Sequence, residues 1–239
     1  MNLFIITGHS RGLGRALAEC VHAHGHRVVG LSRTLVADPR WQSVEADLAQ
    51  PEAAAGVLAE VLQQQDWTGI DQVVLINNAG SVQPIAPIQR LDLAKTAASI
   101  QINLVSPMLL TSTLLRFAQA AGLPCRVLNI SSGAAHAAYP GWGTYCAGKA
   151  GLDHFVRVAG VEGLPDFRMA SVAPGVVDTG MQDEIRHASV ADFPMLDRFV
   201  ALHDQGQLSA PAAVAEKLVA YVLSDAMKHG EVTDVRQWS

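Results

Sequence analysis

Tyr145 and Lys149 are two residues whose types and spacing fit a chemical role. They stand four positions apart in the stretch YCAGK, so a helix there places the phenol and the ammonium on one face. A nearby ammonium favours the phenolate, and we expect it to lower a pKa that is about 10 in isolated tyrosine. Such a tyrosine gives a proton to a carbonyl oxygen while a hydride reaches the carbon. The spacing alone is common, so its meaning depends on the rest of the chain.

A glycine-rich stretch, TGHSRGLG, lies between a short apolar run and a helical pattern near the start of the chain. A strand-to-helix turn of this kind holds a pyrophosphate with its backbone amides and the helix N-terminus. Gly8 permits the tight turn, Gly12 lets phosphate approach, and Gly14 lets helix and strand pack closely. The expected binding turn also includes Ser10, Arg11 and Leu13. The alternative is a turn with a purely structural role.

The residues after the second apolar run indicate which dinucleotide binds. NAD sites usually place an acid about 20 residues after the glycines, on the ribose hydroxyls. Here the stretch reads LSRT, and no acid comes before Asp38. Arg33 and Arg11 can clamp a 2′-phosphate through their planar forks of donors. NADP(H) is therefore the expected cofactor, unless both arginines are ordinary solvated surface residues.

Short apolar runs alternate with longer helical patterns along the whole chain. Strands are predicted at 3–7, 27–31, 44–47, 72–77, 126–131, 169–173 and 231–235, and helices at 13–21, 52–65, 92–119, 143–161 and 211–223. This alternation predicts an α/β fold, a Rossmann-type doubly wound parallel sheet with helices on both faces. The length of 239 residues fits a single domain, 1–239.

The segment 176–208 carries only weak periodicity between two regular elements, so we expect a substrate lid there. Apolar contact surface for an aryl-sized or pterin-sized ketone comes from Met181, Phe193, Met195, Leu196 and Phe199. The alternative is a pair of ordinary surface helices that pack those residues into the core.

Composition argues against several other classes of function. The net charge of −5 gives no basic surface for nucleic acid, and the longest apolar stretches break before the ~20 residues of a membrane span. Three cysteines far apart, with no C-x-x-C, favour a reducing cytoplasm over a disulfide scaffold. Gly25 breaks the helix in HAHGH, and His22 and His24, two positions apart, do not share a helical face, so no metal site is expected.

Taken together, TGHSRGLG, NNAG at 77–80, NISS at 129–132 and YCAGK resemble the short-chain dehydrogenase/reductase family along essentially the whole chain. The resemblance implies that Ser132 binds the substrate carbonyl and that Asn103 completes the catalytic set with Tyr145 and Lys149. It also implies that Lys149 holds the nicotinamide ribose. Further cofactor contacts are implied at Asp47, Leu48, Asn78, Ala79, Gly80, Pro174, Gly175, Val177 and Thr179.

Pro107 stands four residues after Asn103 and has no N–H. If this stretch is helical, the carbonyl of Asn103 loses its intrahelical partner and must find another. A water there would link Asn103 to Lys149, which is the proton relay that the family resemblance implies. A simple helix kink is the alternative.

Within the family, the chain is most similar to sepiapterin reductases and bacterial benzil reductases. The likeness rests on APGVVDTGMQ at 173–182, LDRF at 196–199 and GEVTD at 230–234. It implies a carbonyl substrate, such as a vicinal diketone or a pterin side chain. Asp234 then falls where sepiapterin reductases anchor the pterin amino group, although a solvated terminal residue is equally compatible. Trp142 and Met181 are further candidates for substrate contact.

Two other functions remain open: a catalytically silent NADP-binding sensor, and an epimerase or dehydratase that uses the same pair. The intact Tyr145 and Lys149 count against the sensor, and the glycine spacing counts against the epimerase. By analogy with the family, the chain is expected to form a homodimer or homotetramer.

Overall fold

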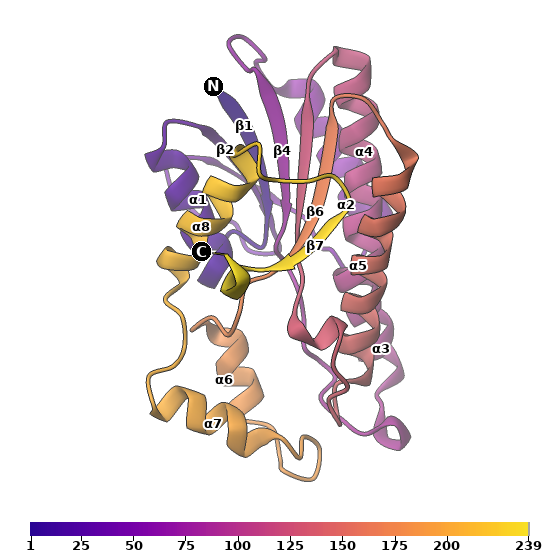
Figure 1. Ribbon diagram of the computed structural model, residues 1–239. Coiled ribbons are helices and arrows are strands. Elements are labelled where there is room, and N and C mark those ends of the chain that lie inside the picture. The colour runs from indigo at the N-terminus through magenta and orange to yellow at the C-terminus, as the bar shows by residue number, and fades with distance from the viewer. Residues whose placement is uncertain (239) are drawn as a thin grey trace.

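A seven-stranded parallel sheet forms the centre of the computed structural model, which describes residues 1–238 (Figure 1). The strand order is β3-β2-β1-β4-β5-β6-β7. Most strands are buried along their length because helices cover both faces. Their bounds are β1 Asn2–Thr7, β2 Arg27–Ser32, β3 Gln42–Glu45, β4 Gln72–Asn77, β5 Cys125–Ile130, β6 Phe167–Ala173 and β7 Glu231–Asp234.

Two layers of helices enclose the sheet, which confirms the predicted doubly wound α/β fold (Figure 1). On one face lie α1 (Gly12–Ala23) and α8 (Pro211–Leu223), which pack against each other. On the other face lie α2 (Pro51–Gln64), α4 (Ser106–Ala121) and α5 (Gly143–Glu162). Each layer buries its own apolar core against the sheet, so both faces of the strands are covered.

The strand order changes direction between β1 and β4, because the chain builds β1, β2 and β3 outward and then returns to the centre. Such a switch point leaves a crevice beyond the carboxyl ends of the strands, where ligands bind in folds of this type. The glycine turn after β1 and the segment after β4 both begin there.

Some predicted elements have the observed bounds, and others differ. The predictions for β4 and α8 match the structure, but the third strand is Gln42–Glu45 instead of 44–47. β3 is a half-exposed edge strand, so a buried-strand pattern located it poorly. The long predicted helix is α3 (Leu93–Ile100), a π-helix (Gln101–Val105) and then α4.

The helical stretch Leu93–Ala121 is long and apolar enough, by length and composition alone, to cross a membrane. This differs from the sequence-based expectation of no such stretch. In the fold, α4 packs on α2 and buries Ser106 and Thr111, and the Ser106 hydroxyl donates a hydrogen bond to the Leu48 carbonyl. Buried polar contacts of this kind fit a helix packed in a protein core.

The segment 176–208 contains α6 (Gly180–Arg186) and α7 (Leu196–Asp204), which extend beyond the carboxyl end of the sheet (Figure 1). A parallel bridge joins Val177 to Ser209, and the backbones of Val176 and Asp178 also bond to Ser209. The two ends of the segment are therefore fastened together, and the helices between them form a separate flap.

Candidate active site

A cavity of about 690 Å³ lies at the carboxyl ends of the strands. Every residue that the sequence assigned to cofactor binding lines it: Gly8, Ser10, Arg11, Gly12, Leu13, Gly14, Arg33, Asp47, Leu48, Asn78, Ala79, Gly80, Tyr145, Lys149, Pro174, Gly175, Val177 and Thr179. Ser132, Trp142 and Met181 line the same cavity. Asn103 and Asp234 do not.

The glycine turn has the conformation that a phosphate cradle needs. Gly8 and Gly12 have φ values of +69° and +55°, which side chains rarely adopt. A Cβ at Gly14 would lie 2.1 Å from the Gly8 carbonyl oxygen, so a side chain is excluded there. Arg11 at the N-cap of α1 makes no capping bond, and the first turn carries no acid. The backbone donors of this turn suit a diphosphate.

Hydrogen bonds between β1 and β4 fix the turn in place. The Thr7 hydroxyl accepts from the backbone N–H groups of Asn78 and Ala79, each at 3.0 Å. The Asn78 amide in return donates to the Thr7 carbonyl at 2.9 Å. The segment NNAG therefore supports the glycine turn as well as lining the cavity.

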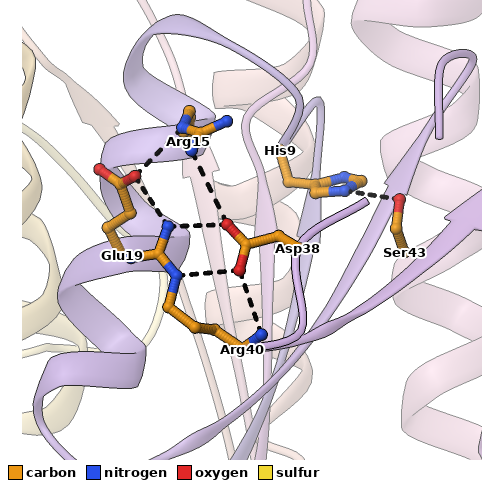
Figure 2. A network of polar contacts seen from close by, with 6 residues as sticks. All are labelled: His9, Arg15, Glu19, Asp38, Arg40 and Ser43. Atoms are coloured by element: carbon orange, nitrogen blue, oxygen red, sulfur yellow. Dashed lines mark hydrogen bonds and ion pairs between the residues drawn. The ribbon is translucent and has the colours of Figure 1, made fainter. Parts of the chain in front are cut away.

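A network of charged groups surrounds Asp38, the first acid after β2 (Figure 2). Arg40 donates to its carboxylate at 2.9 and 2.7 Å, and Arg15 forms an ion pair with it at 3.7 Å. Glu19 accepts from both arginines. The hydrogen bonds from Arg40 lower the pKa of Asp38 to about 2. The carboxylate is thus committed to protein cations, and it does not line the cavity.

His9, within the glycine turn, is fully buried beside β2. Its Nε2 lies 2.9 Å from the Ser43 hydroxyl (Figure 2). That hydroxyl also accepts a hydrogen bond from the Val36 backbone at 3.0 Å. A Cβ at Gly30 would lie 2.1 Å from the imidazole ring, so this glycine makes room for the histidine. Burial lowers the pKa of His9, opposed by a hydrogen bond with the Leu31 backbone. His9 therefore connects the turn to Val36 in the cavity wall.

Tyr145 and Lys149 lie on the buried face of α5, next to the end of β5. The Lys149 ammonium donates to the Ile130 carbonyl at 2.7 Å and lies 6.0 Å from the centre of the Tyr145 ring. Burial raises the pKa of Tyr145, and a hydrogen bond with Ser132 opposes the rise. The prediction of a lowered pKa is wrong for this structure, because burial outweighs the opposing hydrogen bond with Ser132. Burial also lowers the pKa of Lys149 to about 8.

Asn103 lies in the π-helix, behind the cavity wall. Its side chain donates to the Ser81 carbonyl at 2.8 Å and accepts from the Ser81 N–H at 3.1 Å. A Cβ at Gly80 would lie 3.0 Å from Asn103 Oδ1 and 3.6 Å from Lys149 Nζ, so Asn103 and Lys149 approach the same point. The disruption expected from Pro107 takes the form of a π turn, a feature frequent at functional sites.

An aromatic cluster closes one end of the cavity. Trp142 is buried, and its ring stacks on Phe193 at 4.6 Å between ring centres. It also contacts Tyr145 edge-on at 5.5 Å and Phe199 at 5.2 Å. Trp142 therefore packs in this cluster and also lines the cavity. Phe193 and Phe199 come from the flap, so this cluster joins the flap to α5.

Asp234 is held by Arg236 instead of facing the cavity. The guanidinium donates to both carboxylate oxygens, at 2.9 and 2.5 Å, and the Arg236 backbone adds a third bond. This arrangement weighs against the predicted pterin contact at Asp234, because Arg236 already makes three hydrogen bonds to its carboxylate. Arg236 itself lines the cavity, as do Arg198, Gln182 and Val36. Gln182 and Arg198 fall within the stretches APGVVDTGMQ and LDRF, but the sequence assigned them no contact, and Val36 and Arg236 belong to no recognisable motif.

The histidines considered in the sequence do not gather into one site, but His24 meets two other potential ligands. Cys20, His24 and Glu216 offer ligand atoms within 4.8 Å of one another. Burial, together with Glu216, raises the pKa of Cys20 to about 12. Because a metal binds the thiolate, this environment disfavours a metal centre.

Comparisons with known proteins agree with the fold. Residues 2–189 match the family described as short chain dehydrogenase. A benzil reductase, (S)-benzoin forming, of Bacillus subtilis (strain 168) is 38% identical over 245 residues, covering 100% of both chains. A sepiapterin reductase of Rattus norvegicus is 33% identical, covering 96% of this chain and 94% of the relative.

Among solved structures, the KRED1-Pglu enzyme superposes with a TM-score of 0.84 at 29% identity, covering 97% of this chain and 100% of that one. Family match, relatives and fold agree with one another over nearly the entire length. Members of this family are oxidoreductases that use nicotinamide cofactors. The chain therefore belongs to the short-chain dehydrogenase/reductase family.

Proposed function

We propose that this protein is an NADP(H)-dependent carbonyl reductase that also catalyses the reverse oxidation of the alcohol. One observation carries the proposal: Ser132, Tyr145 and Lys149 line the same cavity as the glycine turn and Arg33. A dinucleotide that spans such a cavity places its reactive ring beside the phenol. The uncapped start of α1 and the close approach of Gly12 to Thr179 support this orientation.

The preference for NADP(H) is supported by the charges at the adenosine end. Arg33 and Arg11 line the cavity and supply positive charge, whereas Asp38 is bound by Arg15 and Arg40. No acid thus stands at the end of β2 to receive the ribose hydroxyls of NAD. A 2′-phosphate meets two guanidinium groups instead.

The side chains divide the chemistry between them. When bound, the reduced nicotinamide supplies a hydride to the carbonyl carbon. Ser132 donates a hydrogen bond to the carbonyl oxygen, and Tyr145 gives that oxygen its proton. Burial, which raises the pKa of Tyr145, keeps the phenol protonated and ready to donate. Lys149 binds the cofactor ribose, and its positive charge stabilises the phenolate that remains after transfer.

The Asn103 side chain makes two hydrogen bonds with the Ser81 backbone. The group of Asn103 that takes part in returning the proton to Tyr145 is therefore its backbone carbonyl. Pro107 cannot donate to that carbonyl because it has no N–H. A water bound there would join Lys149 to the solvent and return the proton after each turnover.

The substrate class follows from the aromatic wall. Trp142, Phe199 and Met181 line the end of the cavity beside Tyr145 and offer apolar contact to a flat, ring-bearing ketone. The relatives named as benzil and sepiapterin reductases act on ketones that carry rings, which supports a vicinal diketone or a pterin side chain.

The proposal is tested by incubating the protein with NADPH and a panel of aryl diketones, aliphatic diketones and pterins while reduced-nicotinamide absorbance is followed. We expect the aryl diketones to react. The Tyr145→Phe variant removes the proton donor, so it should bind NADPH nearly as well as wild type and lose at least nine-tenths of its turnover. A variant that keeps more than a tenth of wild-type turnover contradicts the role given to Tyr145.

Two further properties belong to this proposal. Following the family tendency, the protein forms a homodimer or homotetramer, and apolar Val158 and Val161 are exposed on α5 for such a contact. Light scattering of the purified protein measures this directly. A location in the cytoplasm, inferred from the dispersed cysteines, is tested by fractionation of the source cells.

A further inference from the structure

Asp153 is a buried carboxylate that the proposed reaction does not use. It lies one helical turn after Lys149 on α5 and is 1% exposed. The Ser171 hydroxyl on β6, itself fully buried, donates to its Oδ1 at 2.5 Å. Withdrawing a carboxylate from water is costly unless its charge is paired or bonded. A carboxylate retained one turn from the lysine of the site therefore suggests a role for its charge.

The second oxygen of Asp153 has a different environment. Oδ2 is shielded from solvent and makes no hydrogen bond within residues 1–238. The Nε2 of His136 lies 3.2 Å away, close enough for an ion pair but off the axis of a hydrogen bond. His136 comes four residues after Ser132, and its side chain is 55% exposed. Asp153 thus lies between the lysine of the site and an imidazole that reaches solvent.

The groups around the Tyr145–Lys149 pair are otherwise neutral or distant. From β5 the ammonium meets the Ile130 carbonyl, and from the π-helix it faces the Asn103 amide. Ser132 faces the phenol, and the Cys146 thiol adjoins it. Asp153 supplies the negative charge that opposes the effect of burial on the pKa of Lys149. The carboxylate of Asp153 is itself contacted by Ser171 and His136.

We propose that Asp153 is a positioning residue whose buried charge sets the pH at which the Tyr145–Lys149 pair releases its first proton. The inference rests on the proposed reductase function. A negative charge beside the pair makes proton loss harder from the ammonium and from the phenol alike. The direction of the effect therefore does not depend on which of the two coupled groups titrates first. Asp153 keeps the pair in the protonated, proton-donating form over a wider pH range.

The test is Asp153→Asn, which has nearly the same shape and keeps an oxygen that accepts from Ser171. The pH dependence of kcat/KM for NADPH-linked diketone reduction is measured for both proteins. We expect the alkaline midpoint to fall by about one pH unit in the variant, the size of effect that one nearby charge has. In the oxidation direction, which needs the phenolate, the acid limb should move the same way.

A readout without turnover separates this proposal from the proposed function. The chain has four lysines, so NMR titration of lysine labelled with ¹³C follows Lys149 individually. Burial already lowers the pKa of Lys149, and its midpoint should fall further in Asp153→Asn. If diketones are not reduced but this midpoint moves, the reductase proposal fails and the charge effect stands.

Two variants act as controls. Ser171→Thr keeps both the hydroxyl that donates to Asp153 and the charge, so it should leave both midpoints within about 0.2 pH unit of wild type. His136→Lys, at an exposed position, sets a fixed positive charge beside Asp153 and should lower the midpoints even if Asp153→Asn fails to fold. A rate that is reduced equally at every pH in Asp153→Asn, with unmoved midpoints in that variant and in His136→Lys, would overturn the proposal.

Discussion

Arg33 is exposed at the end of β2, where it lines the cavity. We expect Arg33→Ala to raise the Kd for NADPH by one to two decades and to leave the Kd for NADH much less affected. The physical reason is the loss of a charge-assisted contact to the 2′-phosphate, which contributes roughly 1.5–3 kcal/mol. Protein fluorescence or calorimetric titration with each cofactor measures both constants.

A matched control for that experiment is Arg116→Ala, which removes an exposed arginine of α4 that does not line the cavity. Its effect on either Kd should be small. Equal weakening of NADPH and NADH by Arg33→Ala would show that this side chain does not recognise the phosphate. The same titration of Arg11→Ala measures how much the second arginine contributes to NADPH binding. Arg11 also forms an ion pair with Glu184 at 3.9 Å.

At the scale of elements, the flap formed by α6 and α7 is the segment that we expect to move. Its ends are fastened at Val177 and Ser209, so its opening does not require the sheet to rearrange. Under the proposed function, closure over the reacting carbon would exclude water and strengthen the hydrogen bonds from Ser132 and Tyr145 to the developing alkoxide.

Hydrogen exchange tests the flap directly. We expect residues 178–208 to exchange fast in the free protein and to slow when NADP and an unreactive ketone analogue are both bound. The buried Phe193 and Phe199 set a limit, because they anchor the flap to Trp142 and slow its exchange somewhat in either state. High protection without ligand that stays unchanged on binding would mean that α6 and α7 are ordinary packed helices.

At the scale of the whole molecule, buried His9 links stability to pH. Its pKa in the folded state lies below the unfolded value of about 6.5, because burial disfavours the charged imidazolium. The unfolded chain therefore binds more protons than the folded one below that value. The stability that neutral His9 contributes is present above about pH 6.5 and is lost as the pH falls from there toward the folded-state pKa.

Urea unfolding between pH 5 and 8 measures this dependence. We expect the free energy of unfolding to decline below about pH 6.5 in wild type. His9→Gln should be less stable at neutral pH and show a weaker decline, because one of the contributing histidines is gone. His26 has a lowered pKa as well, so part of the decline remains in the variant. An unchanged pH slope in His9→Gln would show that His9 does not titrate on unfolding.

Much of the fold followed from sequence pattern because its elements are strongly periodic. QVVLIN and the pattern from Pro211 to Leu223 gave the bounds of β4 and α8, since buried strands and amphipathic helices have distinct spacings. β3 was misplaced by two residues, because an edge strand that is half exposed carries little apolar pattern. The π-helix at Asn103 was anticipated only as a disruption, since Pro107 shows that a bond is missing but not how the turn adapts.

The cavity lining was also determined by the sequence, for a topological reason. Once strands and helices alternate, every strand-to-helix turn comes to the same edge of a parallel sheet, so the motifs after β1, β4, β5 and β6 must meet. That argument needs no knowledge of side-chain packing, and the motif residues assigned to the cofactor do line one cavity.

Only the tertiary structure decided which groups contact each charged side chain. Asp234 accepts hydrogen bonds from Arg236, and Asp38 accepts them from Arg40. Asp153 accepts a hydrogen bond from Ser171 and lies within ion-pair distance of His136. The sequence likewise does not show whether the pKa of Tyr145 is raised or lowered, since the shift depends on how completely the phenol is buried. Spacing along a helix or strand tells which face a side chain occupies, but its partner and its access to water depend on segments distant in sequence. For that reason the sequence determined which motifs line the cavity, and the packed structure decided which partners its charged groups have.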